Sequence, residues 1–231
     1  MAFGAHPDDV EMSAAGTILR LKQKGHWVGI VDLSRGELGT RGNANTRAKE
    51  SNNAGKLLNL DCRENLDLGD GNIENNHQNR ISVVAAIRKY KPDFVFINSP
   101  SDRHIDHGKA AQLVLESCFL SGLVKFDNKD KLDPHRPIAI FNYIQDYYHQ
   151  PSFVVDISNV FEEKMKVVLT YATQFYQGFD SKEPTTPISS QAYLEFFKGR
   201  ASQMGRLIGK NFGEGFIANQ PLNIEDLNWF D

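Results

Sequence analysis

Short apolar runs alternate with stretches of helical periodicity along the first half of the chain. Residues 1–5 form an apolar run, and Val10, Ala14, Ile18 and Leu21 follow it at the spacing of one helix face. This pattern predicts a strand and then a helix, and the same pair of signals occurs three more times. The further strands are predicted at 27–33, 63–68 and 94–97, and the helices after them carry Ala54, Leu57 and Leu58, then Val83, Val84 and Ile87, then Ala111, Val114, Leu115, Cys118 and Phe119.

Four successive strand-helix units predict an α/β fold with a mainly parallel, Rossmann-like sheet and helices on both faces. After them, residues 138–143 and 152–157 are predicted strands. A helix stripe from Phe161 to Phe175 and a last helix over 191–210 complete a small C-terminal extension. The Pro-containing loop at 178–190 is too short for a domain linker, so we expect a single domain over 1–231.

Composition narrows the choice of partners. With 40% hydrophobic and 24% charged residues the chain has the composition of a globular protein, and a net charge of -3 without a long basic run gives no nucleic-acid footprint. We therefore expect a small-molecule substrate. The only two cysteines, Cys62 and Cys118, favour neither a disulfide framework nor a thiolate zinc site. No secretory leader and no apolar stretch of 18 residues is seen, which predicts a cytoplasmic protein without a membrane segment.

Two polar clusters follow two of the predicted strands. His6-Pro7-Asp8-Asp9 comes directly after the first strand, and residues 102–107 (Asp-Arg-His-Ile-Asp-His) come after the strand at 94–97. Ligands of open α/β sheets bind at the carboxyl ends of the strands. A His-Asp-His set from these clusters would give zinc three ligands and leave one position open for water.

Each cluster also has a plain structural interpretation when taken alone. His6 and His104 could be ordinary loop histidines, and Asp8, Asp9 or Asp106 could cap the helix that follows. The combination of two such groups at two strand ends favours a metal site. The same donors bind iron(II) or cobalt(II), so the sequence alone does not choose the metal.

The segment Ala5-His6-Pro7-Asp8-Asp9-Val10-Glu11, with the later His104-x-Asp106-His107, resembles the LmbE-like, or PIG-L, family of zinc deacetylases. The resemblance covers nearly the whole chain. Within the family, the chain resembles the branch that acts in bacillithiol biosynthesis. Segments of that branch are matched at 32–40, 46–50, 66–71, 90–92, 134–137, 141–143 and 171–175. Relatives usually have a longer first strand than the five residues before His6. We expect this difference to affect the stability of the protein rather than the chemistry of its site.

The resemblance implies a role for each motif residue. Zinc would be held by His6, Asp9 and His107. Asp8 matches the general base, and His104 matches a histidine that stabilises the oxyanion or protonates the leaving amine. Asp106 would orient His104, and four residues fall where relatives contact substrate: Arg47, Asp70, Arg136 and Tyr193. The two arginines could instead be surface ion-pair residues, and Asp70 could serve only its Gly-flanked turn.

The resemblance suggests N-acetylglucosaminyl malate as substrate, with glucosaminyl malate and acetate as products. Two arginines suit the two malate carboxylates, because guanidinium binds carboxylate in a bidentate manner. An alternative is a zinc deacetylase for another N-acetylglucosamine derivative or a mycothiol-type conjugate. A nucleotide-binding module is disfavoured, since the chain lacks G-x-G-x-x-G after the first strand, and a non-catalytic metal-binding protein would not need Asp8 and His104. The family also implies a homo-oligomer.

Overall fold

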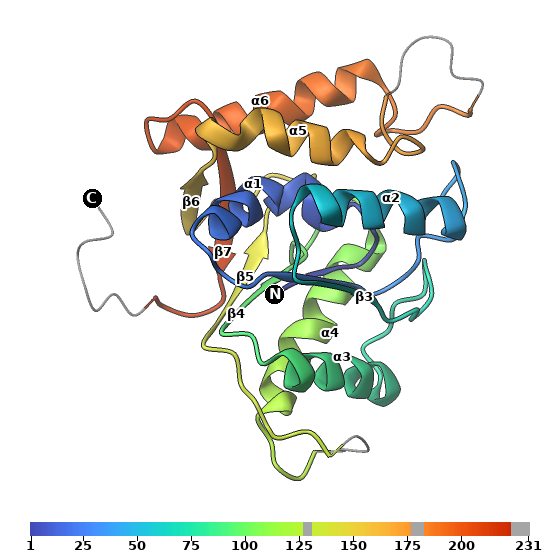
Figure 1. Cartoon of the computed structure of the whole chain (residues 1–231), viewed down its shortest axis with the longest axis vertical. Helices are drawn as coiled ribbons and strands as arrows, with labels where there is room; N and C mark the ends of the chain where they lie inside the picture. The colour runs from blue at the N-terminus through green and yellow to red at the C-terminus, as the bar shows by residue number, and fades with distance from the viewer. Residues whose placement is uncertain (127–130, 177–182, 223–231) are drawn as a thin grey trace.

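The computed structural model describes residues 1–126, 131–176 and 183–222, and within them a seven-stranded sheet runs through the molecule (Figure 1). The strand order is β3-β2-β1-β4-β5-β7-β6. The strands are β1 (Ala2–Gly4), β2 (Gly29–Asp32), β3 (Cys62–Asn65), β4 (Phe94–Ile97), β5 (Ala139–Tyr143), β6 (Phe153–Asp156) and β7 (Gly213–Ala218). The first five strands are parallel, and β7 is antiparallel to both β5 and β6. The predicted α/β fold with a mainly parallel sheet is confirmed.

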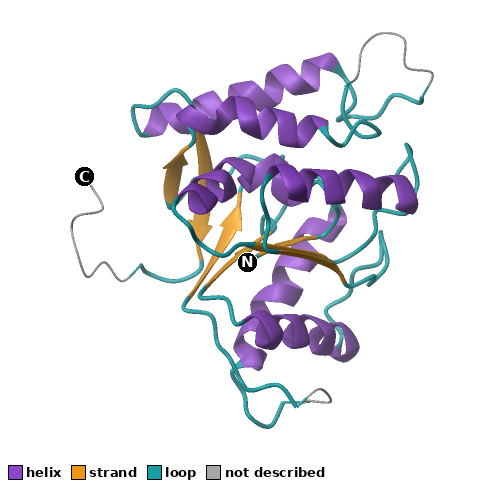
Figure 2. Ribbon diagram, viewed as in Figure 1, coloured by secondary structure: helices purple, strands orange, loops and turns teal. Residues whose placement is uncertain are grey.

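Helices cover both faces of this sheet (Figure 2). One face carries α1 (Asp9–Gln23) and α2 (Ala44–Leu57), and the other carries α3 (His77–Tyr90) and α4 (Ile105–Ser121). Helix α5 (Phe161–Leu169) packs on α1, and α6 (Gln191–Leu207) packs on β7. A short 3₁₀ turn, η1 (Ser158–Val160), leads into α5. None of the helices in the described part of the chain is long and apolar enough to span a membrane.

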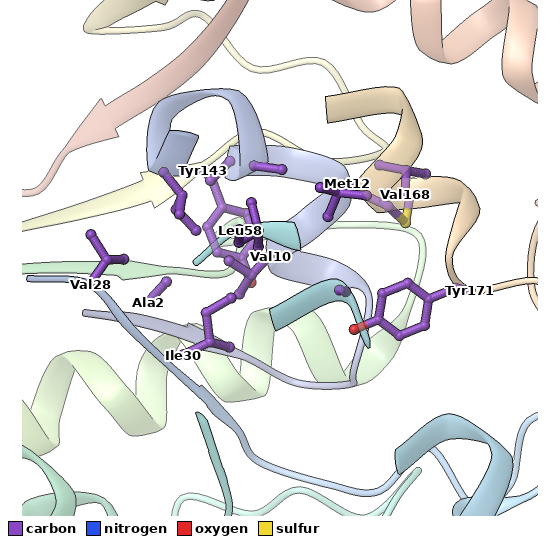
Figure 3. Close-up of a cluster of buried hydrophobic side chains, with 14 of the residues drawn as sticks. Ala2, Val10, Met12, Val28, Ile30, Leu58, Tyr143, Val168 and Tyr171 are labelled. Carbon is purple, nitrogen blue, oxygen red and sulfur yellow. The ribbon is translucent and has the colours of Figure 1, made fainter. Parts of the chain in front are cut away.

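Two hydrophobic cores lie on opposite sides of the sheet, and alternate strand residues divide between them. Ala2 and Ile30 belong to the core under α1, whereas Phe3 and Val31 belong to the core under α3 and α4. Figure 3 shows Val10 of α1 beside Ala2 and Ile30 in the first core. Because both faces are covered, the central strands are apolar at nearly every position, which is the pattern their sequence shows.

The boundaries of some elements differ from the predictions. The predicted first strand, 1–5, is observed as Ala2–Gly4 in the middle of the sheet, between β2 and β4. The helix stripe from 161 to 175 ends at Leu169, because a series of turns follows. Strand β7 was not predicted. Of the predicted loop at 178–190, residues 178–182 lie outside the described residues.

Candidate active site

The carboxyl ends of β1 and β4 lie side by side, and the two polar clusters of the sequence meet there. They line a cavity of about 320 Å³. Loop 36–40, α2 and residues 186–188 complete its wall. Of the predicted site residues, seven line this cavity: His6, Asp8, Asp9, Arg47, Asp70, His104 and His107.

The proposed zinc ligands lie next to one another in this cavity. The Asp9 carboxylate lies between two imidazoles, with Oδ2 3.5 Å from His6 Nδ1 and Oδ1 3.2 Å from His107 Nε2. All three side chains are buried. A nitrogen of His104 also lies within 4.8 Å of ring nitrogens of His6 and His107. Imidazole nitrogens with a carboxylate form a donor set that suits zinc, so the arrangement fits that ion.

Carboxylates hold the outward nitrogens of both candidate histidine ligands. His6 Nε2 lies 3.0 Å from Asp70 Oδ1 and 3.3 Å from Asp106 Oδ2. His107 Nδ1 lies 2.9 Å from Asp102 Oδ2. Such contacts fix the ring orientation and the tautomer of a metal-binding histidine.

Asp9 is itself held by amide donors. Its Oδ2 accepts from the His6 backbone N–H at 3.0 Å and from Asn98 Nδ2 at 3.1 Å, and its Oδ1 accepts from Gln145 Nε2 at 2.7 Å. These donors keep the carboxylate facing both imidazoles. Neither Asn98 nor Gln145 was expected from the sequence, because each follows a strand as an isolated amide rather than as part of a polar cluster.

The charges of the cluster reinforce one another. Burial lowers the pKa of His6, but hydrogen bonds with Asp106, Asp70 and Asp9 outweigh this effect and hold the pKa well above its usual value. Burial likewise lowers the pKa of His107, and Asp9 outweighs this to bring it to about 9. For Asp9, burial raises the pKa, yet His107 and His6 hold it well below its usual range. The carboxylates of the cluster therefore stabilise positive charge on the two imidazoles beside Asp9.

Asp8 precedes α1 and faces the cavity beside Asp9. Its Oδ2 lies 3.0 Å from Nη2 of Arg47, an arginine of α2 that is 4% exposed. Burial raises the pKa of Asp8 to about 7, although Arg47 acts in the opposite direction. Arg47 was expected to contact substrate, whereas the structure pairs its guanidinium with Asp8.

His104 and Asp106 differ from the expected pairing. His104 caps α4, because its Nδ1 accepts the backbone N–H of Asp106 at 3.2 Å. The Asp106 carboxylate instead accepts from Gly71 N–H at 2.7 Å and contacts His6. The reason is geometric: Asp106 lies in the first turn of α4, over the end of β1. Burial, followed by the charges of His6 and His107, lowers the pKa of His104.

Two expected substrate contacts are not part of the cavity. Arg136 precedes β5 at the amino end of the sheet, where its Nη2 donates to the carbonyl of Phe119 at 3.1 Å. From Phe119 back to His107 is about 18 Å along α4, at roughly 1.5 Å per residue. Within this chain the structure therefore does not bring Arg136 together with the other predicted site residues.

Tyr193 does not line the cavity. It lines a neighbouring space of about 30 Å³, and its hydroxyl donates to Asp146 Oδ1 at 3.2 Å. Asp146 Oδ2 in turn accepts from Nε of Arg103 at 2.5 Å, and Arg103 does line the main cavity. Arg103 and Asp102 both belong to the polar cluster at 102–107, so the sequence indicated that they lie near the site. Their individual contacts follow from the fold and could not be predicted from the sequence.

Known proteins resemble this chain in sequence. The family model described as PIG-L, GlcNAc-PI de-N-acetylase, matches residues 1–118. The chain belongs to the PIG-L family. Diacetylchitobiose deacetylase of Thermococcus kodakarensis is 30% identical over 224 residues, which cover 91% of this chain and 79% of that protein. The predicted family and the predicted hydrolytic N-deacetylase activity are confirmed.

Solved structures extend this similarity to the whole fold. The conserved protein TT1542 from Thermus thermophilus superposes with a TM-score of 0.87 at 31% identity, over 98% of this chain and 96% of that one. N,N'-diacetylchitobiose deacetylase from Pyrococcus horikoshii has a TM-score of 0.80 at 28% identity, over 94% of this chain and 82% of that one.

Proposed function

We propose that this N-deacetylase hydrolyses the acetamide of N-acetylglucosaminyl malate, a step in bacillithiol biosynthesis, and releases glucosaminyl malate and acetate. The observation that carries the proposed hydrolysis is the meeting of His6, Asp9 and His107 in one cavity with Asp8 and His104 beside them. These are the groups that a metal-assisted hydrolysis needs: three ligands, a base and a proton donor.

Zinc would be held by His6, Asp9 and His107. When bound, it lowers the pKa of water toward about 7 and polarises the acetamide carbonyl, and iron(II) could replace it in the cell. The carboxylates of Asp70, Asp102 and Asp106 keep the two imidazoles in place from the outer side.

Asp8 and His104 perform the proton transfers. As water attacks the carbonyl carbon, its proton passes to the Asp8 carboxylate. The negative charge of the oxyanion raises the lowered pKa of His104, so that this imidazole takes up a proton from solvent and donates it to the sugar nitrogen. The C–N bond then breaks and leaves a neutral amine and acetic acid, which ionises to acetate. Proton exchange with solvent returns Asp8 to its starting state. His104, while protonated, also stabilises the oxyanion that precedes bond breaking.

The position of Arg103 favours a substrate whose aglycone is negatively charged. Its guanidinium lines the cavity and its side chain is 43% exposed, with Nε on Asp146. Arg47 and Arg103 both pair with a carboxylate, but Arg47 is buried whereas Arg103 is exposed enough to contact a ligand. Arg136 does not line the cavity. A malate carboxylate at the rim would therefore meet Arg103, and the sugar would occupy the space between it and His6.

A second candidate substrate is N,N'-diacetylchitobiose or another uncharged N-acetylglucosamine derivative. The names of the similar archaeal enzymes favour it. The two candidates share the acetamide and the reaction, and they differ in whether the aglycone carries negative charge.

Turnover of a substrate panel tests the proposal. Zinc-loaded protein is incubated with N-acetylglucosaminyl malate, N-acetylglucosamine and N,N'-diacetylchitobiose, and acetate and free amine are measured. We expect the highest kcat/KM for the malate conjugate. A higher value for the disaccharide would reject malate and leave the deacetylase, whereas release of acetate from none of them would reject the proposed reaction on these sugars.

A further inference from the structure

The backbone at Asp8 is unusual. Its φ is 118°, while the other non-glycine residues with positive φ in the described part of the chain have values of 48° to 52°. Those values are close to the left-handed minimum near 57°, where several residue types are tolerated. Asp8 lies far outside it, in a conformation that persists only where the surroundings impose it.

Arg47, in α2, contacts the chain on both sides of this backbone position. Its Nη2 donates both to the backbone carbonyl of Pro7 and to Oδ2 of Asp8, the latter at 3.0 Å. One nitrogen therefore holds the main chain on one side of the strained residue and its side chain on the other. Breaking either contact would let the peptide between Pro7 and Asp8 rotate.

The loop after β2 keeps the guanidinium in place. Gly36, with a φ of +64°, packs so closely that a Cβ there would lie 3.1 Å from Cζ and 3.2 Å from Nη2 of Arg47. The arginine is also nearly fully buried. The Nη2 group of this buried guanidinium is already used by two acceptors, so it is poorly suited to bind an incoming substrate.

We propose that Arg47 is a positioning residue: it clamps the Pro7–Asp8 turn so that the Asp8 carboxylate points into the cavity, and it is not a substrate ligand. The inference rests on the proposed role of Asp8 as the base. It replaces the sequence-based expectation that Arg47 contacts substrate.

Three variants test the clamp: Arg47→Ala, Arg47→Lys and Gly36→Ala. For Arg47→Ala we expect kcat to fall about 100-fold with KM and bound zinc unchanged, because a misplaced base costs rate rather than affinity. Arg47→Lys should recover part of kcat, since an ammonium can reach one of the two acceptors. Gly36→Ala should lower kcat in the same manner by displacing the guanidinium. Arg35→Ala, which removes an exposed arginine paired with Asp67, is the matched control and should leave kcat unchanged.

A crystal structure of each variant gives the second measurement. In Arg47→Ala we expect residue 8 to leave the region near +118°, and if that variant does not fold, Arg47→Lys and Gly36→Ala provide the same comparison. Retention of φ near +118° overturns the inference, and so does a raised KM with unchanged kcat, which would indicate substrate binding.

Failure of the proposed reaction can be told apart from failure of the clamp. If the parent protein hydrolyses none of the acetamides, the conformation of residue 8 still decides the inference. Unfolding of the metal-free Arg47→Ala, Asp8→Asn and double variants adds an independent test. We expect clearly non-additive denaturation midpoints, and additive ones would overturn the clamp.

Discussion

The carboxylate of Asp102 lies 2.9 Å from Nδ1 of His107, and the Asp102 side chain is fully buried. Its Oδ1 accepts two backbone N–H groups, those of Arg103 and Tyr147, each at 2.8 Å. A carboxylate fixed in this way keeps a proton on Nδ1, so that Nε2, on the side of Asp9, is the ring nitrogen available to a metal ion.

Asp102→Asn is therefore expected to weaken zinc binding by about 10–100-fold, because the amide no longer fixes the ring and tautomer. Competition with a chromogenic chelator measures this directly, without substrate. The control Asp67→Asn removes an exposed carboxylate and should leave zinc affinity unchanged. Parental affinity in Asp102→Asn would show that His107 is held by its packing alone.

The ligand set is tested by removing one ligand at a time. We expect one zinc per chain in the parent protein and much weaker binding in His107→Ala. Elemental analysis after dialysis gives the stoichiometry. The assignment fails if His107→Ala binds zinc as tightly as the parent, or if a zinc-bound structure places His104 rather than His107 at bonding distance.

Asp8→Ala separates the base from the ligands. It should retain zinc, because Asp8 is not needed to hold the ion, and should lose turnover by about 10²–10⁴-fold. Acetate release and metal content are measured on the same preparation. Turnover close to the parent value would exclude Asp8 as the base.

The strand-helix units could be predicted because both faces of the sheet are covered, so each central strand is a continuous apolar run. The same logic failed for β7. Gly213 and Gly215 interrupt its pattern, and its place between β5 and β6 depends on antiparallel pairing with strands distant in sequence. Local periodicity does not contain that information.

The site could be predicted as far as its clusters, because His6 and His107 follow strands that lie next to each other. Which carboxylate faces which imidazole could not be predicted. Asp102 and Asp106 lie in one short segment, and the start of α4 turns the first toward His107 and the second toward His6. The position of Arg136 beside Phe119, rather than in the cavity, likewise follows from the fold alone.

Replacing Arg103 and replacing Arg136 should affect substrate choice differently. Arg103→Ala should reduce kcat/KM about tenfold for N-acetylglucosaminyl malate and leave N-acetylglucosamine unaffected, since the plain sugar has no carboxylate to lose its partner. Arg136→Ala is the control, because Arg136 does not line the cavity, and it should leave kcat/KM unchanged for both substrates. Equal losses on both substrates in Arg103→Ala would place this arginine against the sugar or the fold instead.

The last prediction concerns stability and involves a buried ion pair outside the cavity. Nζ of Lys164 in α5 lies 2.5 Å from Oε1 of Glu214 in β7, and both side chains are at most 3% exposed. Glu214 also accepts the backbone N–H groups of Gly16 and Thr17 at 2.9 and 2.6 Å, so it joins α1 to the unpredicted strand.

Lys164→Met should destabilise the metal-free protein by about 3–5 kcal/mol, because it leaves the Glu214 carboxylate buried without its cation. The double variant Lys164→Met/Glu214→Gln should recover part of this loss, since the remaining neutral amide is less costly to bury than an unpaired charge. Denaturant-induced unfolding gives each free energy. Lys210→Met is the matched control: Lys210 is exposed and 3.9 Å from Asp156, and its replacement should change stability by no more than about 0.5 kcal/mol. If Lys164→Met unfolds at the same denaturant concentration as Lys210→Met, the contacts of Glu214 with α1 are sufficient without the lysine, and the ion pair does not stabilise the junction of α1, α5 and β7.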